Sequence, residues 1–160
     1  AKLFLYFQVQ ALSVVLFALP FYIAASNAGG VVSPWIVLGV LVWAVSLAGE
    51  TIADQQLARF RANPRNRGLT CRSGLWRYSR HPNYFFEWLH WFSYVLLSLG
   101  TPLWWLSLSG VVLMGVSLCW VTGIPFAEKQ ALRSRGEDYR LYQQQTSVFF
   151  PWFPRPPASP

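Results

Sequence analysis

The stretch VVSPWIVLGVLVWAVSLAG at residues 31–49 decides the fold, because it runs for a membrane-spanning length without one charged side chain. A helix needs about 20 residues, at a rise of about 1.5 Å each, to cross the hydrocarbon core of a bilayer. Three further apolar segments of similar length lie at residues 3–25, 83–99 and 103–121. The sequence therefore predicts an all-α fold, a polytopic membrane helix bundle with four transmembrane helices.

The composition of the 160-residue chain supports this class of fold. Hydrophobic residues make up 54% and charged residues only 12%, whereas soluble domains carry about 25% charged residues. Aromatic residues reach 18%, which excludes a disordered chain because such chains are poor in aromatic side chains. We therefore expect one membrane domain over residues 1–160, in contact with a lipid bilayer, rather than an ordinary soluble enzyme.

The placement of charge predicts the topology of an integral, multi-pass membrane protein. The chain has 13 Lys and Arg against 6 Asp and Glu, a net charge of +7. All the cations except Lys2 fall in the connection 50–82 or after residue 121, and the connections 26–33 and 100–102 carry no charge. Basic residues accumulate on the cytoplasmic side, so both termini are expected to be cytoplasmic. Because the basic segments then lie against a membrane, a nucleic-acid partner is not expected.

Two helices are predicted to extend into the cytoplasm. The second span is expected to continue to about Arg61, where Pro64 stops the helix. Pro125 suits the first turn of a new helix, in which Gly136 lowers stability by about 1 kcal/mol relative to Ala. The tail at residues 151–160 is rich in Pro and is expected to be extended.

The most informative stretch is GLWRYSRHPNYFFE, residues 74–87, which runs from a basic connection into the third span. Asn83, Glu87, His90 and Tyr94 lie on one helix face there. An ionisable residue in a span faces the bundle or a wet cavity by default. Glu87 is thus a predicted functional residue, with a structural carboxylate as the alternative, and His90 is interpreted as a packing residue.

A nucleotide is the ligand class that these polar residues favour. Arginines and His81 gather before the helix that Pro82 opens, and free N–H groups at a helix start attract anions. Arginine forks match phosphate oxygens, whereas the side chains of Asp54, Asn83 and Glu87 suit ribose hydroxyls. No G-x-G-x-x-G motif occurs in the sequence, so a different architecture must hold the nucleotide. The cysteines, 2 in number, are too few for a zinc site.

These motifs resemble a known family. The segment WRYSRHPNYFFEW at residues 76–88 resembles the signature of bacterial membrane proteins of the steroid 5-alpha-reductase-like group, the DUF1295 family. The segments ETIADQQLARFR at 50–61, GEDYRLY at 136–142 and TSVFFPW at 146–152 are similar to the same family. The resemblance covers essentially the whole chain, and the motifs together are more specific than any one of them.

The resemblance implies an NADPH-dependent membrane reductase in a bacterial inner membrane, with the cofactor in a cytoplasm-facing cavity. Its hydrophobic substrate would be a steroid-like or prenyl-like lipid with a carbon–carbon double bond conjugated to a carbonyl group. Carried over to this sequence, the family pattern implies as cofactor-binding residues Asp54, Arg59, Arg61, Tyr78, His81, Asn83, Tyr84, Glu87, Tyr139 and Tyr142. It implies no metal site, and it leaves the catalytic residues unassigned.

Two departures from the family pattern keep other functions open. Phe86 stands where the family commonly has Gly, and its ring could fill part of the cofactor pocket. Family members also have further N-terminal spans, which this sequence is expected to lack. Both departures favour a non-catalytic membrane subunit or scaffold with a membrane-protein partner.

An S-adenosylmethionine-dependent membrane methyltransferase is the remaining alternative. The isoprenylcysteine carboxyl methyltransferases are distantly similar, because they share the pattern Arg-His-Pro-x-Tyr, residues 80–84 here. S-adenosylmethionine has no phosphate, however, and so would not need the many arginines of the basic connection. The sequence therefore favours the reductase over the methyltransferase.

Overall fold

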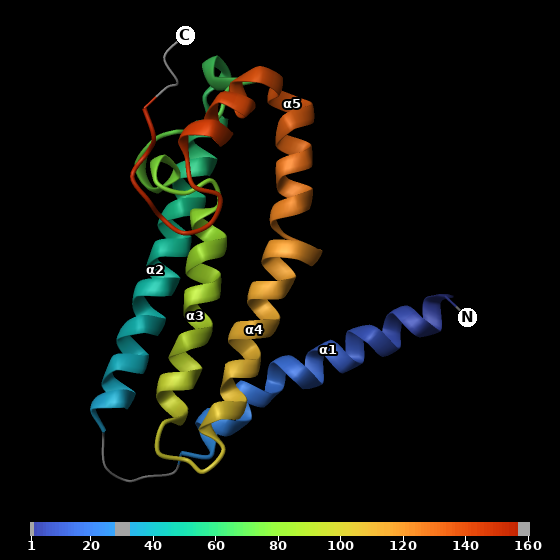
Figure 1. Ribbon diagram of the computed structural model, residues 1–160, viewed down its shortest axis with the longest axis vertical. Coiled ribbons are helices and arrows are strands. Elements are labelled where there is room, and N and C mark those ends of the chain that lie inside the picture. Colours follow the sequence, from blue (N-terminus) through green and yellow to red (C-terminus); the bar gives the residue numbers. More distant parts are fainter. Residues whose placement is uncertain (1, 28–32, 157–160) are drawn as a thin grey trace. The chain divides into compact units, whose positions relative to one another are not determined.

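The computed structural model describes residues 2–27 and 33–156, and this part of the chain contains helices and connections but no strand. The main helices of Figure 1 are α1 (Lys2–Ala25), α2 (Pro34–Ala62), α3 (Pro82–Ser98), α4 (Leu108–Val116) and α5 (Ile124–Gln145). Shorter turns are η1 (Pro64–Asn66), η2 (Gly74–Arg77), η3 (Trp104–Ser107) and the π-helical turn η4 (Ser117–Val121). The all-α prediction is confirmed. Residues 151–156 of the tail have no regular structure, and the rest of the predicted extended tail lies outside the described residues.

Three helical runs of the described chain are long and apolar enough to cross a membrane: α1, α2 and the run Trp104–Gln145, which comprises η3, α4, η4 and α5. The last run has 42 residues. At about 1.5 Å per residue, a run of this length is about twice what the hydrocarbon core requires, and its second half carries charged residues. The α3 helix has only 17 residues and carries Glu87 and His90. The fourth span and the cytoplasmic placement of the termini therefore stay predictions.

Prolines mark the helix boundaries that the sequence indicated. The α2 helix begins at Pro34 and ends at Ala62, directly before the turn that Pro64 opens. The fixed φ and missing N–H of proline suit a helix start but interrupt a helix interior. The predicted end of this helix near Arg61 and the predicted opening of α5 by Pro125 are both confirmed.

The α5 helix is bent at Gly136, as Figure 1 shows. The backbone there has φ 53° and ψ −120°, a left-handed conformation that glycine adopts without the steric cost of a Cβ. The sequence predicted one helix weakened at this glycine, whereas the structure has two helical pieces. The bend brings the hydroxyl of Tyr139 within 2.8 Å of the Glu128 carboxylate on the first piece.

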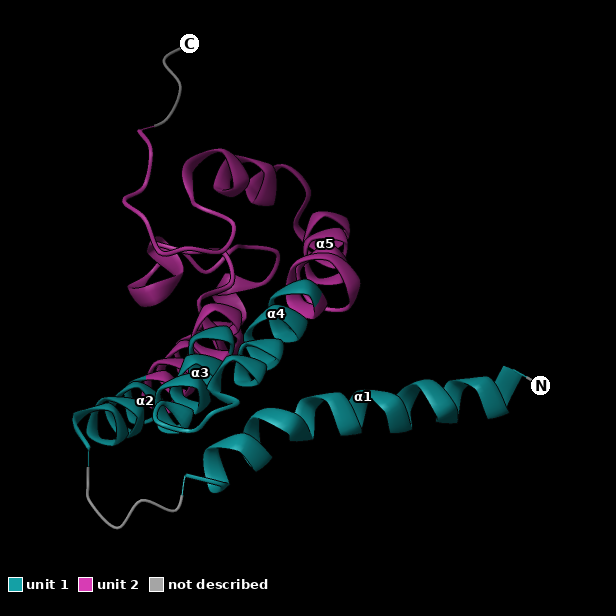
Figure 2. Ribbon diagram, turned by 60° about the horizontal axis from the view of Figure 1, so that its bottom comes forward, with its two compact units in different colours: residues 1–45, 88–116 teal, residues 46–87, 117–160 magenta. Residues whose placement is uncertain are grey.

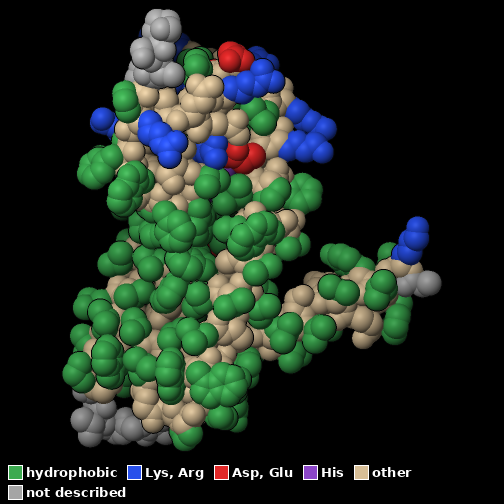
Figure 3. All heavy atoms as spheres, viewed as in Figure 1, with side chains coloured by type: hydrophobic (Ala, Val, Ile, Leu, Met, Phe, Trp, Pro, Cys, Tyr) green, Lys and Arg blue, Asp and Glu red, His purple; other side chains and the backbone are tan. Residues whose placement is uncertain are grey.

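The chain forms two compact units (Figure 2). Unit 1 contains residues 1–45 and 88–116, and unit 2 contains residues 46–87 and 117–160. Lys2 is the one Lys, Arg, Asp or Glu in the sequence of unit 1, so unit 2 carries the other 12 of the 13 cations and all 6 acidic residues. In Figure 3 the visible charged side chains accordingly gather on unit 2, apart from a cation at the free end of α1. The prediction of a single membrane domain stays a prediction.

Unit 1 has an aromatic core suited to an apolar environment. Trp91 is buried with Val95 and Val111, and Phe17 packs on Trp91 with ring centroids 5.1 Å apart. The C-terminal half of α1 supplies Phe17, whereas its N-terminal half leaves its apolar side chains exposed. An exposed apolar helix of this length is typical of a lipid-facing span, so unit 1 lacks the polar surface of a soluble domain.

Candidate functional site

Buried hydrogen bonds in unit 2 fix the segment that precedes α3. The indole N–H of Trp76 donates to the Ala53 carbonyl oxygen of α2 at 2.8 Å. The backbone N–H of Leu75 donates to the Gln56 side-chain oxygen, also on α2, at 2.9 Å. Because a buried polar group without a partner costs about 1–3 kcal/mol, these bonds hold η2 against α2. The motif identified in the sequence therefore enters α3 in a defined position.

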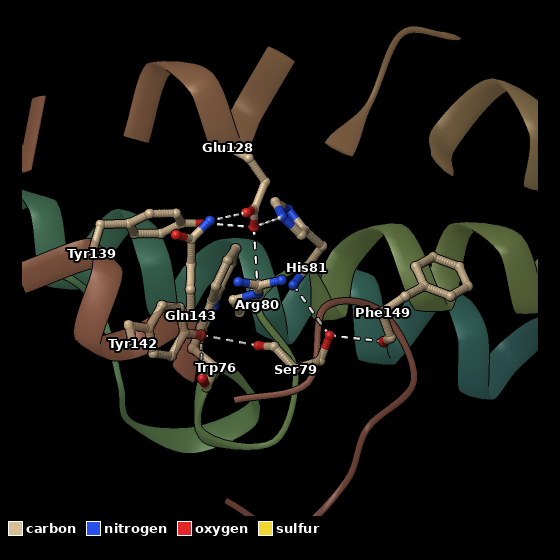
Figure 4. Close-up of polar contacts among 9 residues, drawn as sticks. All are labelled: Trp76, Ser79, Arg80, His81, Glu128, Tyr139, Tyr142, Gln143 and Phe149. Atoms are coloured by element: carbon tan, nitrogen blue, oxygen red, sulfur yellow. Dashed lines mark hydrogen bonds and ion pairs between the residues drawn. The ribbon is translucent and has the colours of Figure 1, made fainter. Parts of the chain in front are cut away.

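The C-terminal segment 147–155 is hydrogen-bonded to the same motif. The Ser147 carbonyl oxygen accepts from the Arg80 N–H at 2.8 Å. The Ser79 hydroxyl donates to the Phe149 carbonyl oxygen at 2.8 Å, as Figure 4 shows. The segment that resembled the end of the family pattern is thus a structural support for the central motif.

Glu128 is the centre of a polar cluster in unit 2 (Figure 4). Its Oε1 atom lies 3.0 Å from Nε2 of His81 and 2.8 Å from the Tyr139 hydroxyl. The same oxygen lies 3.4 Å from Nε of Arg80, and the Gln143 amide donates to the other carboxylate oxygen. Only 15% of the Glu128 side chain is exposed, so these neighbours replace most of its hydration.

The surroundings of Glu128 keep it ionised. Burial by itself would raise the pKa of Glu128, because a buried carboxylate loses its hydration. Hydrogen bonds from three neighbours and the charge of Arg80 outweigh burial and lower this pKa to about 2. Burial and the bond to Glu128 raise the pKa of Tyr139, so the tyrosine is the donor. Glu128 is therefore ionised at neutral pH, and Arg80 lies beside it as its counter-charge.

A cavity of about 430 Å³, called cavity A below, lies in unit 2. Binding sites for small molecules commonly have volumes of about 300–1,000 Å³. Its polar lining residues are Asp54, Arg61, Thr70, Arg80, His81, Asn83, Tyr84, Thr122, Gln130, Arg135, Tyr139 and Tyr142. Seven of the ten residues implied by the family pattern are among them: Asp54, Arg61, His81, Asn83, Tyr84, Tyr139 and Tyr142. The structure thus brings most of the predicted site together.

The other three predicted residues, Arg59, Tyr78 and Glu87, are not among the residues that line cavity A. Arg59 is exposed on α2. Tyr78 is also exposed, and its ring packs against Phe153 with centroids 6.1 Å apart. Glu87 is half-buried on α3, one turn beyond Asn83. The roles of these three residues in cofactor binding stay predictions.

Several polar atoms of the residues that line cavity A lack hydrogen-bond partners within the described part of the chain. They are Oγ1 of Thr70, Nε of Arg80, Oδ1 of Asn83 and Nε of Arg135. The Asn83 amide nitrogen is used, because it donates to Oδ1 of Asp54 at 3.0 Å. Buried polar atoms in native proteins are nearly always paired, so these atoms are exceptions within unit 2, and each has almost no solvent-accessible surface.

Phe86 lies against α2 rather than in cavity A. A Cβ atom added at Gly49 would lie 2.4 Å from Cε1 of the Phe86 ring, which shows how closely the ring packs on this glycine. Phe86 is not among the residues that line cavity A. Phe86 thus packs outside cavity A, and the hypothesis that its ring fills part of a cofactor pocket stays a prediction.

We expect Gly49→Ala to destabilise the protein. Overpacking of this kind costs about 1–3 kcal/mol, because the new methyl group must displace the Phe86 ring. The melting temperature in detergent should fall, and Gly49→Ala combined with Phe86→Leu should recover part of the loss. An unchanged melting temperature in the single variant, or no recovery in the double variant, would contradict the observed packing.

The sequence motifs indicate no role in the site for Glu128, Arg135 or Gln143. The sequence offers one indication that Glu128 is functional: it is one of only 6 acidic residues in the chain, and it comes shortly after an apolar segment. No sequence feature indicates a role for Gln143, because its contact with Glu128 depends on the bend within α5. Among the described residues, no group of three His, Cys, Asp or Glu side chains is placed to hold a metal ion.

The three apolar helical runs and the charged unit with its polar cavity fit an all-helical integral membrane protein. The chain belongs to the DUF1295 family, described as a protein of unknown function, which matches residues 1–146. The family resemblance predicted from the motifs is therefore confirmed.

One curated relative carries an enzyme name. The chain is 36% identical over 63 residues to the probable O-methyltransferase ustE of Ustilaginoidea virens, a stretch that covers 38% of this chain and 22% of that protein. The chain thus matches less than a quarter of the length of this curated relative. No solved structure matches the chain.

Proposed function

We propose that the protein is an NADPH-dependent membrane reductase that acts on a lipid-like molecule with a conjugated carbon–carbon double bond. The observation that carries the proposal is the mixture of groups around cavity A, where Arg61 and Arg135 line the same space as Asp54. Arginine forks bind phosphate oxygens, and a carboxylate binds ribose hydroxyls. A dinucleotide presents both kinds of group, whereas S-adenosylmethionine presents only the second.

The residues around cavity A fit such a cofactor. NADPH, when bound, supplies a hydride. Asp54, whose side chain is exposed and lines the cavity, would accept a hydrogen bond from a ribose hydroxyl. His81 and Tyr84 are stacked with ring centroids 5.4 Å apart and an interplanar angle of 6°, and they would offer a flat surface to an aromatic ring of the ligand.

An S-adenosylmethionine-dependent O-methyltransferase is the second candidate. The observation in its favour is the 36% identity over 63 residues to a relative named as a probable O-methyltransferase. Asp54 and Asn83 would suit the ribose of that cofactor equally well. The number of arginines favours the dinucleotide, because S-adenosylmethionine offers them one carboxylate, whereas NADPH offers several phosphate groups.

Ligand binding to the purified protein in detergent tests the proposal. NADPH, NADH and S-adenosylmethionine would be compared by calorimetry, for the wild type, Arg61→Ala and Glu87→Gln. We expect NADPH to bind, and Arg61→Ala to weaken it about 10-fold or more, since a hydrogen bond to a charged group contributes about 1.5–3 kcal/mol. Glu87→Gln tests a predicted residue that does not line cavity A. Arg133→Ala, an exposed arginine of α5 outside the cavity lining, is the matched control.

The remaining outcomes of this binding experiment each favour a different function. A preference for S-adenosylmethionine would move the assignment to methyl transfer. Failure of all three ligands to bind a protein with a normal melting transition would favour the non-catalytic subunit. An equal loss of NADPH affinity in Arg61→Ala and Arg133→Ala would show that the arginines act only through net charge.

A further inference from the structure

A second cavity, cavity B, lies in unit 2 and has a volume of about 540 Å³. Four residues line both cavities: Leu57, Arg61, Gln130 and Arg135. Because the two cavities have these side chains in common, they adjoin each other. A ligand that occupies both cavities would pass these four side chains.

Cavity B is lined by three arginines, Arg61, Arg67 and Arg135, and the described residues of its lining include no Asp or Glu. The ion pairs found in the described part of the chain involve other cations, so no carboxylate there neutralises these three. Positive groups collected in one cavity raise the local concentration of anions. Cavity B is thus suited to an anionic group that carries more than one charge.

The arginines that line cavity B include Arg67, in the hydrogen-bonded loop after α2, and Arg135, in α5. The Asn66 amide donates to the Phe60 carbonyl oxygen at 2.8 Å, and the Arg67 N–H donates to the Pro64 carbonyl oxygen at 3.2 Å. On the other side, the Arg135 guanidinium lies over the Tyr139 ring at 4.9 Å from its centroid. These contacts fix the backbone of the loop at Arg67 and the guanidinium of Arg135, which lowers the entropic cost of binding a ligand.

We propose that cavity B binds the 2′-phosphate at the adenosine end of NADPH, and that Arg67 selects NADPH over NADH. This inference rests on the proposed function. NADPH differs from NADH only by that phosphate, and a phosphate monoester carries about −1.5 to −2 charges at neutral pH. Arg67 lines cavity B but not cavity A, so its charge acts on one end of the ligand.

The positions of the lining residues along the chain agree with an orientation in which the adenosine end of the ligand lies in cavity B. Tyr84 and Thr122 line cavity A and adjoin the apolar segments in sequence, where the proposed lipid-like substrate would bind. Arg67 belongs to the basic connection between α2 and α3. The reactive end of the dinucleotide would therefore lie in cavity A, and its charged adenosine end in cavity B.

The test compares Arg67→Ala with Arg65→Ala, a matched control in the same loop whose residue lines neither cavity. Dissociation constants for NADPH and NADH would be measured with each detergent-purified full-length protein. We expect Arg67→Ala to weaken NADPH about 10-fold or more and to leave NADH unchanged, and Arg65→Ala to change neither. Added salt should weaken NADPH more than NADH in the wild type, because it screens the extra charge.

The outcomes separate the two proposals. If the wild type binds NADPH but Arg67→Ala weakens both dinucleotides equally, or neither, the 2′-phosphate assignment is wrong and the reductase proposal stands. If the wild type binds neither dinucleotide, the reductase proposal is wrong and the assignment of cavity B to a dinucleotide falls with it. Equal losses in Arg67→Ala and Arg65→Ala would show an effect of net charge only, which also overturns the assignment.

Discussion

Glu128→Ala is expected to lower the melting temperature of the protein in detergent by about 10 °C. The substitution leaves Arg80, His81 and Tyr139 without the carboxylate that they contact. Removing one partner of a buried ion pair costs about 3–5 kcal/mol, because the remaining charge stays buried and uncompensated. For a protein of this size each kcal/mol corresponds to about 2–4 °C. A thermal scan followed by intrinsic tryptophan fluorescence would measure the loss.

The same carboxylate predicts a pH dependence with a definite sign. The pKa of Glu128 in the folded protein is about 2, below its ordinary value of 4.5. Stabilisation by the ionised form is therefore complete above pH 4.5 and is lost as the pH falls toward 2, by about 3 kcal/mol in all. Glu128→Gln should remove this dependence, so wild type and variant should differ most at neutral pH and converge in acid.

Glu137→Ala is the matched control for the Glu128 variants. Glu137 belongs to the same helix and pairs with Arg140 at 3.1 Å, but its side chain is 70% exposed. Surface ion pairs contribute little to stability, so this variant should melt close to the wild type. A similar loss at both positions would mean that overall charge, rather than the buried cluster, stabilises unit 2.

Much of the fold could be predicted because apolar length and proline placement are local properties of the sequence. The end of α2 before Pro64 and the start of α5 near Pro125 followed from the geometry of proline alone. The bend at Gly136 was only half predicted, since glycine permits a left-handed backbone but does not require one. The short length of α3 depends on the turns that flank it, which hydropathy does not describe.

The candidate site was harder to predict, because it depends on contacts between residues far apart in sequence. Charge and residue type indicated Asp54, Arg61 and Asn83, and these residues do line cavity A. Position in a helix also indicated Glu87, which does not line the cavity. No periodic pattern could have revealed Arg135 as a residue shared by two cavities, because that depends on the packing of α5 near the basic connection.

Asp54→Ala should weaken NADPH binding about 10- to 100-fold, the second largest effect that we expect. The substitution removes one acceptor for a ribose hydroxyl and also releases the Asn83 amide, which donates to Asp54 at 3.0 Å. Hydrogen bonds to a charged group contribute about 1.5–3 kcal/mol each, and each 1.4 kcal/mol is about tenfold in affinity. Calorimetry on the detergent-purified variant would measure the change. Gln55→Ala, the exposed neighbour on α2 that does not line cavity A, is the control.

The choice of ligands makes this variant more informative than a simple loss of binding. A ribose contact is common to NADPH and NADH, so Asp54→Ala should weaken both by the same factor, whereas Arg67→Ala should weaken NADPH alone. A loss confined to NADPH would place Asp54 near the phosphate instead. An unchanged affinity for both would mean that the dinucleotide does not occupy cavity A. Asn83→Ala should reproduce part of the Asp54→Ala effect, because the two side chains form one hydrogen-bonded pair and their losses should not add fully.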